Sequence, residues 1–345
     1  MSRSTELVDE SIRRRAAGDE LWILAAWRAS RLSPLLFGLL CGTGVAAIAA
    51  SPLLISSAVT VNPAELVVSG LFFGVSIAVL TGFTPLIFPG AAADLTRLAP
   101  LINVSDAELE ILQKAMVRLP RRELWFMTAL GLILGLGHSM LLGQVRMPLD
   151  LYLPQIFGTV FLWVAMLWTV PPLLSNALVF SDIGRRTQPN LLDPQSLAPF
   201  GTAAIRPTVF IIGMLCAYPI LALLGDLDTN NMSGIGFIAS FVSMFGLFFL
   251  PLRGIRHQIQ VTRKRTLQQL DAEISKLATN ALENFEDTAT LARLDLLAAT
   301  RDRIAHVSGW PLDLAGVRRV LLYGVLPPIT WAAAALVELV IDQQF

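Results

Sequence analysis

A histidine and a serine stand side by side at His138 and Ser139, inside an apolar stretch of the chain. Such a pair could belong to an intramembrane serine hydrolase, in which an imidazole removes the hydroxyl proton of the nucleophile. The base would have to come from another element, and the other two histidines, His257 and His306, lie in charged segments. We therefore expect His138 and Ser139 to be intramembrane polar residues with a structural hydrogen bond, and a gating or proton-relay role is the alternative.

Signatures of enzymes and of metal sites are missing from the sequence. It contains no Gly-rich phosphate loop followed by a lysine, no His-Glu-x-x-His, no Cys-x-x-Cys and no Gly-x-Ser-x-Gly. Its two cysteines, Cys41 and Cys216, lie inside apolar runs. The formal net charge of zero gives no general attraction to nucleic acid. We expect a protein that is not an enzyme, with no catalytic residue, metal, cofactor or nucleic-acid partner.

The last apolar segment carries the most unusual chemistry of the chain. Its prolines remove backbone donors, and the carbonyls left without partners would not be satisfied by lipid. This half of the segment should therefore pack against protein or line a wet path, with an acidic outer mouth. The alternative is a kinked helix packed in the bundle. The candidate pore or gate residues are Tyr323, Pro327, Pro328, Thr330, Trp331 and Glu338.

These residues must be positioned by helices in a lipid bilayer, because the composition does not suit a soluble protein. Of the 345 residues 54% are hydrophobic and 15% are charged, whereas soluble domains carry about 25% charged residues. Seven apolar segments are long enough to cross a membrane. They are 35–56, 66–88, 124–142, 154–180, 208–224, 235–252 and 320–341.

The distribution of basic residues predicts the orientation of these segments. Of the 26 Lys and Arg residues, all but Arg146 (26 − 1 = 25) fall in the N-terminal arm, in the loops 89–123 and 181–207, or in 253–319. Because cytoplasmic loops are the basic ones, alternating basic and nearly base-free loops indicate an odd number of crossings. The predicted fold class is all-α, a polytopic bundle of seven spans with a cytoplasmic N-terminus and an external C-terminus.

Two cytoplasmic elements precede the third span. The N-terminal arm, residues 1–34, includes an amphipathic stretch at 20–32 that suits an interfacial helix. Within the predicted bundle of spans one to six, residues 35–252, a further helix is expected at about 105–119. Ser105 and Glu108 form the pattern of a capping box at its start, and Pro120 closes it.

The segment 253–319 is predicted to be a cytoplasmic helical hairpin between spans six and seven. Apolar residues recur every three or four positions before and after an interruption at 284–288, which is the pattern of two helices with apolar stripes. The two helices would pack against each other, or against copies from other subunits. The candidate oligomer contacts are Leu267, Leu270, Ile274 and Leu277. Residues 320–345 would form the seventh span and a short external tail.

The fourth segment contains Pro171-Pro172, where we expect a kink or a break. Coupled transporters normally hold carboxylates near the middle of the bilayer. None of the seven segments has a carboxylate at that depth, which lowers the expectation of a coupled transporter.

The C-terminal third resembles a pattern in uncharacterised prokaryotic multi-span membrane proteins. The resemblance rests on Leu250-Pro-Leu-Arg-Gly-Ile-Arg-His257, the helical hairpin, Gly-Trp310-Pro311 and Leu326-Pro-Pro-Ile-Thr-Trp331, and it implies no activity. The architecture also resembles insect olfactory and gustatory receptors, which are tetrameric ligand-gated cation channels whose last helix lines the pore. The chain ends in Gln344-Phe345 like that family's signature, but Val337 and Glu338 replace its Thr and Tyr.

These features lead to an oligomeric ion channel, or a channel-like ligand sensor, with the seventh helix lining the path. One alternative is a secondary transporter of a small solute, with a site where the proline-bearing spans four and seven meet. Another is a non-conducting sensor or assembly protein that docks a partner through its hairpin. The expected location is the plasma membrane (the inner membrane in a bacterium), with membrane lipid and further copies of the chain as partners.

Overall fold

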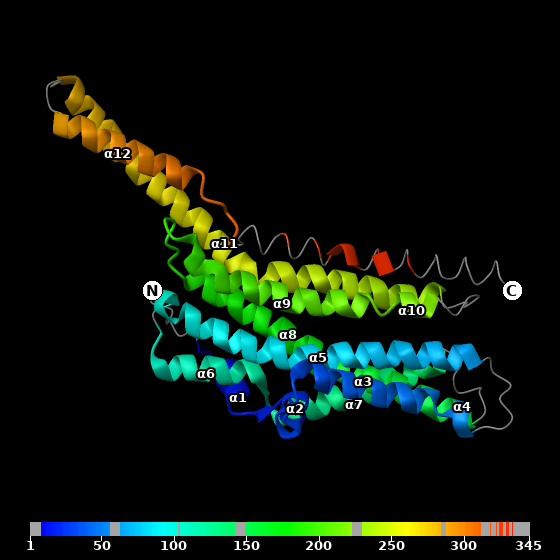
Figure 1. The fold of residues 1–345 in the computed structure, drawn as a ribbon. Coiled ribbons are helices and arrows are strands. Elements are labelled where there is room, and N and C mark those ends of the chain that lie inside the picture. Colours follow the sequence, from blue (N-terminus) through cyan, green and yellow to red (C-terminus); the bar gives the residue numbers. More distant parts are fainter. Residues whose placement is uncertain are drawn as a thin grey trace.

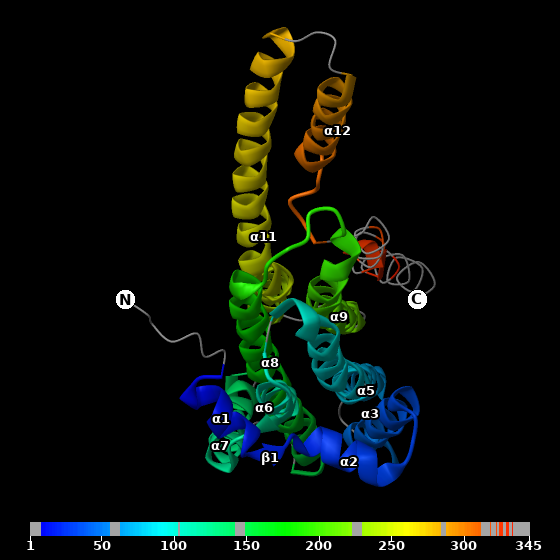
Figure 2. The same ribbon diagram turned by 90° about the vertical axis from the view of Figure 1, so that its left-hand side faces the viewer.

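A computed structural model describes residues 8–55, 63–102, 104–141, 149–222, 230–283 and 288–311, and single positions between 318 and 333. The described chain is all-α apart from one pairing of two-residue strands. Long helices lie side by side in a bundle, and a thin helical hairpin projects from one end of it (Figures 1 and 2). The arrangement is that of a multi-pass helical membrane protein with a projecting hairpin.

Six long helices form the bundle. They are α3 (Pro34–Ala50), α5 (Pro63–Ile102), α7 (Arg121–Leu141), α8 (Leu149–Arg186), α9 (Ala198–Leu215) and the first part of α11 (Asn230–Glu283). Short helical turns, α4 (Pro52–Ile55), η2 (Pro194–Leu197) and α10 (Pro219–Ala222), flank them. Within the described residues, four helices are long and apolar enough to cross a membrane, and a fifth crossing follows if α2 (Trp22–Ser30) and α3, bent by 106°, count as one.

Small residues bring neighbouring helices of the bundle into backbone contact. A Cβ added to Gly38 of α3 would lie 2.5 Å from the carbonyl oxygen of Ala78 on α5. On α7, a Cβ added to Gly135 would lie 2.6 Å from the Cα of Val160 on α8. Dispersion contacts between closely packed helices replace the hydrophobic effect inside a membrane. Helices α7 and α8 therefore pack closely near His138.

The loop predicted at 89–123 is wrong in its first part, because α5 continues as a helix to Ile102. Pro89 and Pro100 lie inside this helix. Leu95 and Leu98 are fully buried, so tertiary packing of this face outweighs the cost of the two prolines. The predicted loop 181–207 is likewise partly helical, since α8 runs to Arg186 and α9 begins at Ala198.

The end of the bundle at which α5 and α8 terminate is closed by a packed layer, which we call the basal layer. It consists of α1 (Glu10–Ala16), α6 (Asp106–Val117), the C-terminal ends of α5 and α8, the start of α9 and the part of α11 near Ile255. Strand β1 (Asp19–Glu20) pairs antiparallel with β2 (Arg118–Leu119) and fixes the N-terminal arm beside α6. Figure 2 shows α1, α6 and β1 together at this end.

Helix α6 begins as the sequence predicts. The Ser105 hydroxyl accepts from the backbone N–H of Glu108, and the Glu108 carboxylate accepts from the backbone N–H of Ser105. These bonds from Ser105, the backbone bond first, lower the pKa of Glu108. Leu112 and Met116 are fully buried, so the apolar face of α6 packs onto the bundle as expected.

The predicted helical hairpin is also confirmed. Helix α11 leaves the bundle without a break, and α12 (Thr288–Ala305) lies antiparallel beside it (Figures 1 and 2). Arg301 pairs with Asp271 at 2.6 Å, and Arg293 pairs with Glu273 at 3.2 Å. The interruption at 284–287 lies outside the described residues.

Candidate functional site

The predicted intramembrane pair does not form a catalytic unit. The indole Nε1 of Trp163 on α8 donates to Nδ1 of His138 on α7 at 3.1 Å, which leaves the imidazole proton on Nε2. The Ser139 hydroxyl instead donates to the carbonyl oxygen of Gly135 at 2.9 Å, one turn earlier in α7. His138 thus has a hydrogen-bond partner on a neighbouring helix, and Ser139 is bonded within its own helix. Whether the role of His138 is structural or that of a gate or proton relay stays a prediction.

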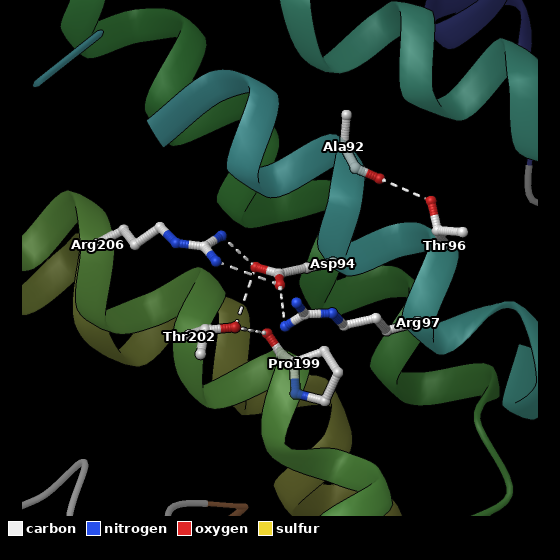
Figure 3. Close-up of polar contacts among 7 residues, drawn as sticks. All are labelled: Ala92, Asp94, Thr96, Arg97, Pro199, Thr202 and Arg206. Atoms are coloured by element: carbon white, nitrogen blue, oxygen red, sulfur yellow. Dashed lines mark hydrogen bonds and ion pairs between the residues drawn. The ribbon is translucent and has the colours of Figure 1, made fainter. Parts of the chain in front are cut away.

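Asp94 of α5 is a fully buried acidic residue in the basal layer, with its side chain 0% exposed. Arg206 of α9 places Nη1 2.5 Å from one carboxylate oxygen and Nη2 3.5 Å from the other. The Thr202 hydroxyl lies 3.0 Å from the same carboxylate, and Arg97 lies 3.9 Å away at the exposed edge (Figure 3). Two cations and a hydroxyl thus surround one buried anion.

Local sequence explains this geometry. Thr202 and Arg206 are one turn apart on α9, so both side chains face α5. Gly90 lies one turn before Asp94, and a Cβ added there would lie 2.7 Å from Nη1 of Arg206. The glycine therefore makes room for the guanidinium, and the cluster locks α5 to α9 in one register.

The chemistry available to this cluster is that of an ionic lock. A buried ion pair adds little net stability, because desolvating two charges offsets their attraction, but loss of one partner is strongly destabilising. Since the Asp94 carboxylate is already bonded to Arg206 and Thr202, it is not poised as a free base or a metal ligand. No group of three or more metal-ligating side chains occurs among the described residues.

A second buried cation, Arg15 of α1, joins the N-terminal arm to α8. Its guanidinium donates to the Ser175 hydroxyl and to the Asn176 side-chain oxygen, both at 2.8 Å. The Asn176 amide then donates to the carbonyl oxygen of Met116 in α6 at 3.0 Å. Both side-chain partners of Arg15 are neutral, and burial lowers its pKa to about 10. The three elements α1, α6 and α8 are therefore linked by one hydrogen-bonded chain.

The candidate oligomer contacts lie on the hairpin, and two of them pack onto their own chain. Leu267 and Leu270 are half-buried against the basal-layer core, and Ile274 and Leu277 are half-buried along the hairpin. Among the described residues of the hairpin, the large apolar side chains that are exposed lie on α12, where Leu291 is 43% and Leu296 67% exposed.

The candidate pore residues fall almost entirely outside the described residues. This applies to Tyr323, Pro327, Pro328, Trp331 and Glu338. Thr330 alone of this set is described, in a helical conformation and half-buried.

Sequence reasoning missed Asp94 and Arg206, because the apolar run was taken to end near Phe88. The signal that could have found them is the helical period of Ala91, Leu95, Leu98 and Ile102. This spacing predicts that the helix continues to Ile102, with Asp94 next to the buried face of the helix.

We compared the chain with protein-family models, with curated protein sequences and with solved structures. No protein-family model, no curated protein sequence and no solved structure matches this chain.

Proposed function

We propose that the chain is a seven-span membrane protein, with its N-terminus in the cytoplasm and its C-terminus outside, that assembles as an oligomeric channel-like sensor. The observation that carries the proposal is the continuity of α11. This helix packs against α8 and α9 in the bundle and against α12 in the hairpin, with no break between Asn230 and Glu283. A displacement of the hairpin is therefore transmitted directly into the bundle.

The orientation is supported by the gathering of basic residues at one end. Arg15, Arg97 and Arg206 all belong to the basal layer, and the charged hairpin leaves the bundle from the same end (Figure 1). Cytoplasmic ends of membrane proteins carry the excess of Lys and Arg. We assign the basal layer and the hairpin to the cytoplasmic side of a plasma membrane.

The conducting path is assigned to the seventh helix and to contacts between copies. Several buried hydroxyls of the described bundle helices donate to carbonyl oxygens one turn earlier in their own helix. They are Thr81, Thr84, Ser139, Thr159 and Thr169. Because these donors are used within their own helices, we do not assign the path to them. We assign it to the polar residues of segment 320–341 on their sequence pattern.

The experiment is reconstitution of the full-length protein in lipid, with its mass and its conductance measured together. We expect an oligomer that conducts, and we expect Leu296→Glu on the exposed face of α12 to lower the oligomer fraction. A monomer without conductance would overturn the proposal. Ala298→Glu, which adds the same charge at an exposed position on the opposite side of α12, serves as the matched control.

A second candidate is a non-conducting assembly protein that docks a partner through the hairpin. The exposure of Leu291 and Leu296 on α12 favours it. It predicts an intact oligomer or complex with no conductance at any voltage, together with the same sensitivity to Leu296→Glu. The transporter alternative is supported less, because α8 remains helical through Pro171-Pro172 and offers no break for a substrate site.

A further inference from the structure

A pocket of about 770 Å³ lies where α11 leaves the bundle. Its wall comes from α11, from the end of α8 and from the chain that follows α12, which meet at the base of the hairpin (Figure 2). Its volume is in the range of small-molecule sites. The lining residues are Arg185, Gly246, Phe249, Leu250, Arg253, Arg256, His257, Gln260 and Trp310.

The charge of the pocket has one sign. Three arginines and a histidine line it, and none of its lining residues is acidic. Among the described residues, no carboxylate forms an ion pair with Arg185, Arg253 or Arg256, whereas the neighbouring Arg186 pairs with Asp182 at 3.1 Å. Guanidinium groups that line one pocket without a carboxylate partner suit a phosphate group in charge and in hydrogen-bonding capacity.

The two halves of the pocket differ in polarity. Gly246, Phe249 and Leu250 lie on the apolar part of α11, and Arg253 to His257 follow directly on its charged continuation. At about 1.5 Å per residue, Gly246 and His257 are roughly 16 Å apart along the helix. The pocket therefore spans the depth at which the chain passes from lipid to water, and its ligand should be amphiphilic.

The aromatic side of the pocket discriminates between head groups. Arg256 lies over the Trp310 ring at 4.0 Å from its centroid, so this ring face is already occupied by a cation. A choline group would compete with Arg256 for this face of Trp310 and would meet arginines that have no carboxylate partner among the described residues. An anionic head group meets neither obstacle.

We propose that this pocket binds one anionic phospholipid of the cytoplasmic leaflet. The lipid phosphate bonds to Arg185, Arg253 and Arg256, and its glycerol and first acyl carbons lie against Phe249 and Leu250. Because the site joins α8, α11 and the segment after α12, a bound lipid fixes the base of the hairpin. The assignment of the leaflet rests on the proposed orientation, but the binding site itself does not depend on conduction.

The test is native mass spectrometry of the full-length protein in detergent, titrated with phosphatidylglycerol or phosphatidylcholine. We expect phosphatidylglycerol to bind more tightly. With roughly fivefold affinity per arginine near a membrane surface, Arg253→Gln with Arg256→Gln should weaken its binding roughly 30-fold. Arg185→Gln, on the other helix, should weaken it roughly fivefold and keeps the test valid if the double variant does not fold.

The matched control is Lys264→Gln with Arg265→Gln, which removes two positive charges from exposed positions of α11 outside the pocket. We expect this variant to bind phosphatidylglycerol as tightly as the parent protein does.

Equal losses of affinity in the two double variants would show general charge attraction and would overturn the proposal. Equal binding of the two lipids would also overturn it. Displacement of the lipid by millimolar glycerol phosphate would assign the pocket to a soluble phosphate compound instead. Loss of conductance with lipid binding intact would count against the proposed function alone.

Discussion

The basal layer and the hairpin contain the same kinds of side chains and use them differently. In the basal layer, the Asp94 side chain is 0% exposed and contacts Arg206 and Thr202. In the hairpin, Asp271 and Arg301 form an ion pair of similar length, with 49% and 45% of their side chains exposed. The Arg206 side chain is 32% exposed, so water screens the first pair less than the second.

The difference shows that burial, rather than the number of ion pairs, decides what a charge contributes. Both regions look alike in the sequence, as charged stretches beside apolar runs. The basal layer becomes a closed core because α5, α8 and α9 carry apolar faces beyond the predicted spans and α1 and α6 cover them. Leu267, Leu270 and Ile304 at the base of the hairpin pack with the basal-layer core, and beyond them the hairpin has its two helices to bury its stripes. We expect substitutions to be costly in the first region and mild in the second.

The largest effect is expected for Arg206→Met. It leaves the buried Asp94 carboxylate without its main counter-ion, which should destabilise the fold by about 3–5 kcal/mol. The measurement is the thermal unfolding midpoint in a mild detergent. Adding Asp94→Asn to Arg206→Met should recover much of the loss, because the uncompensated charge is then removed. A loss from Arg206→Met no larger than that from Arg301→Met would contradict the comparison.

A smaller effect is expected at the junction of the two regions, for Gly254→Ala. The added Cβ would lie 1.7 Å from the carbonyl oxygen of Ser181 on α8, so the backbones of α8 and α11 must separate. We expect a destabilisation of about 1–3 kcal/mol, as in other overpacked positions, read from the same unfolding midpoint. Gly246→Ala is the control, because a Cβ there meets nothing within 4 Å. If both variants unfold at the parent's midpoint, the close crossing is not present.

The next effect is local and concerns Arg15→Met. Removing the guanidinium breaks its bonds to Ser175 and Asn176 and frees α1, at a cost of about 1–2 kcal/mol. Hydrogen exchange should become faster in α1 and unchanged in α12. Arg14→Met is the control, since Arg14 is exposed and pairs only within α1, with Glu10. Unchanged exchange in α1 would mean that Arg15 does not hold the arm.

The smallest effect is expected for Arg301→Ala in the hairpin. The exposed pair with Asp271 should contribute less than about 1 kcal/mol, and less still at high salt. The midpoint should therefore shift little at low ionic strength, and the shift should vanish near 1 M salt. A shift as large as that of Arg206→Met would show that the hairpin is buried, for example by another copy.

Local features of the chain could be predicted from the sequence, and long-range ones could not. The capping box at Ser105 and Glu108 follows from the spacing of two residues. The hairpin follows from apolar periods along a charged segment. Such signals lie within a few turns of helix, so a sequence displays them directly.

The cluster around Asp94 depends on an approach of two helices more than a hundred residues apart. Hydropathy placed Asp94 and Arg206 in loops because a charge lowers the apolar average of any window that contains it. Pro89 lies inside this helix, and packing of Leu95 and Leu98 keeps the helix intact. The seven-span count depends on segments 223–229 and 312–345, which are outside or largely outside the described residues, and it stays a prediction.

The attachment of the N-terminal arm has a consequence for the order of assembly. Arg15 is synthesised early, yet its partner Asn176 lies 161 residues later in the chain. Strand β1 likewise has no partner until β2, which begins at Arg118, has been synthesised. At about 5–20 residues per second, the arm spends roughly 10–30 s without its binding partners. During that time a chaperone or a neighbouring chain can reach it. This early segment is thus fixed only after about half of the chain has been made, and its docking shows that α8 is in place.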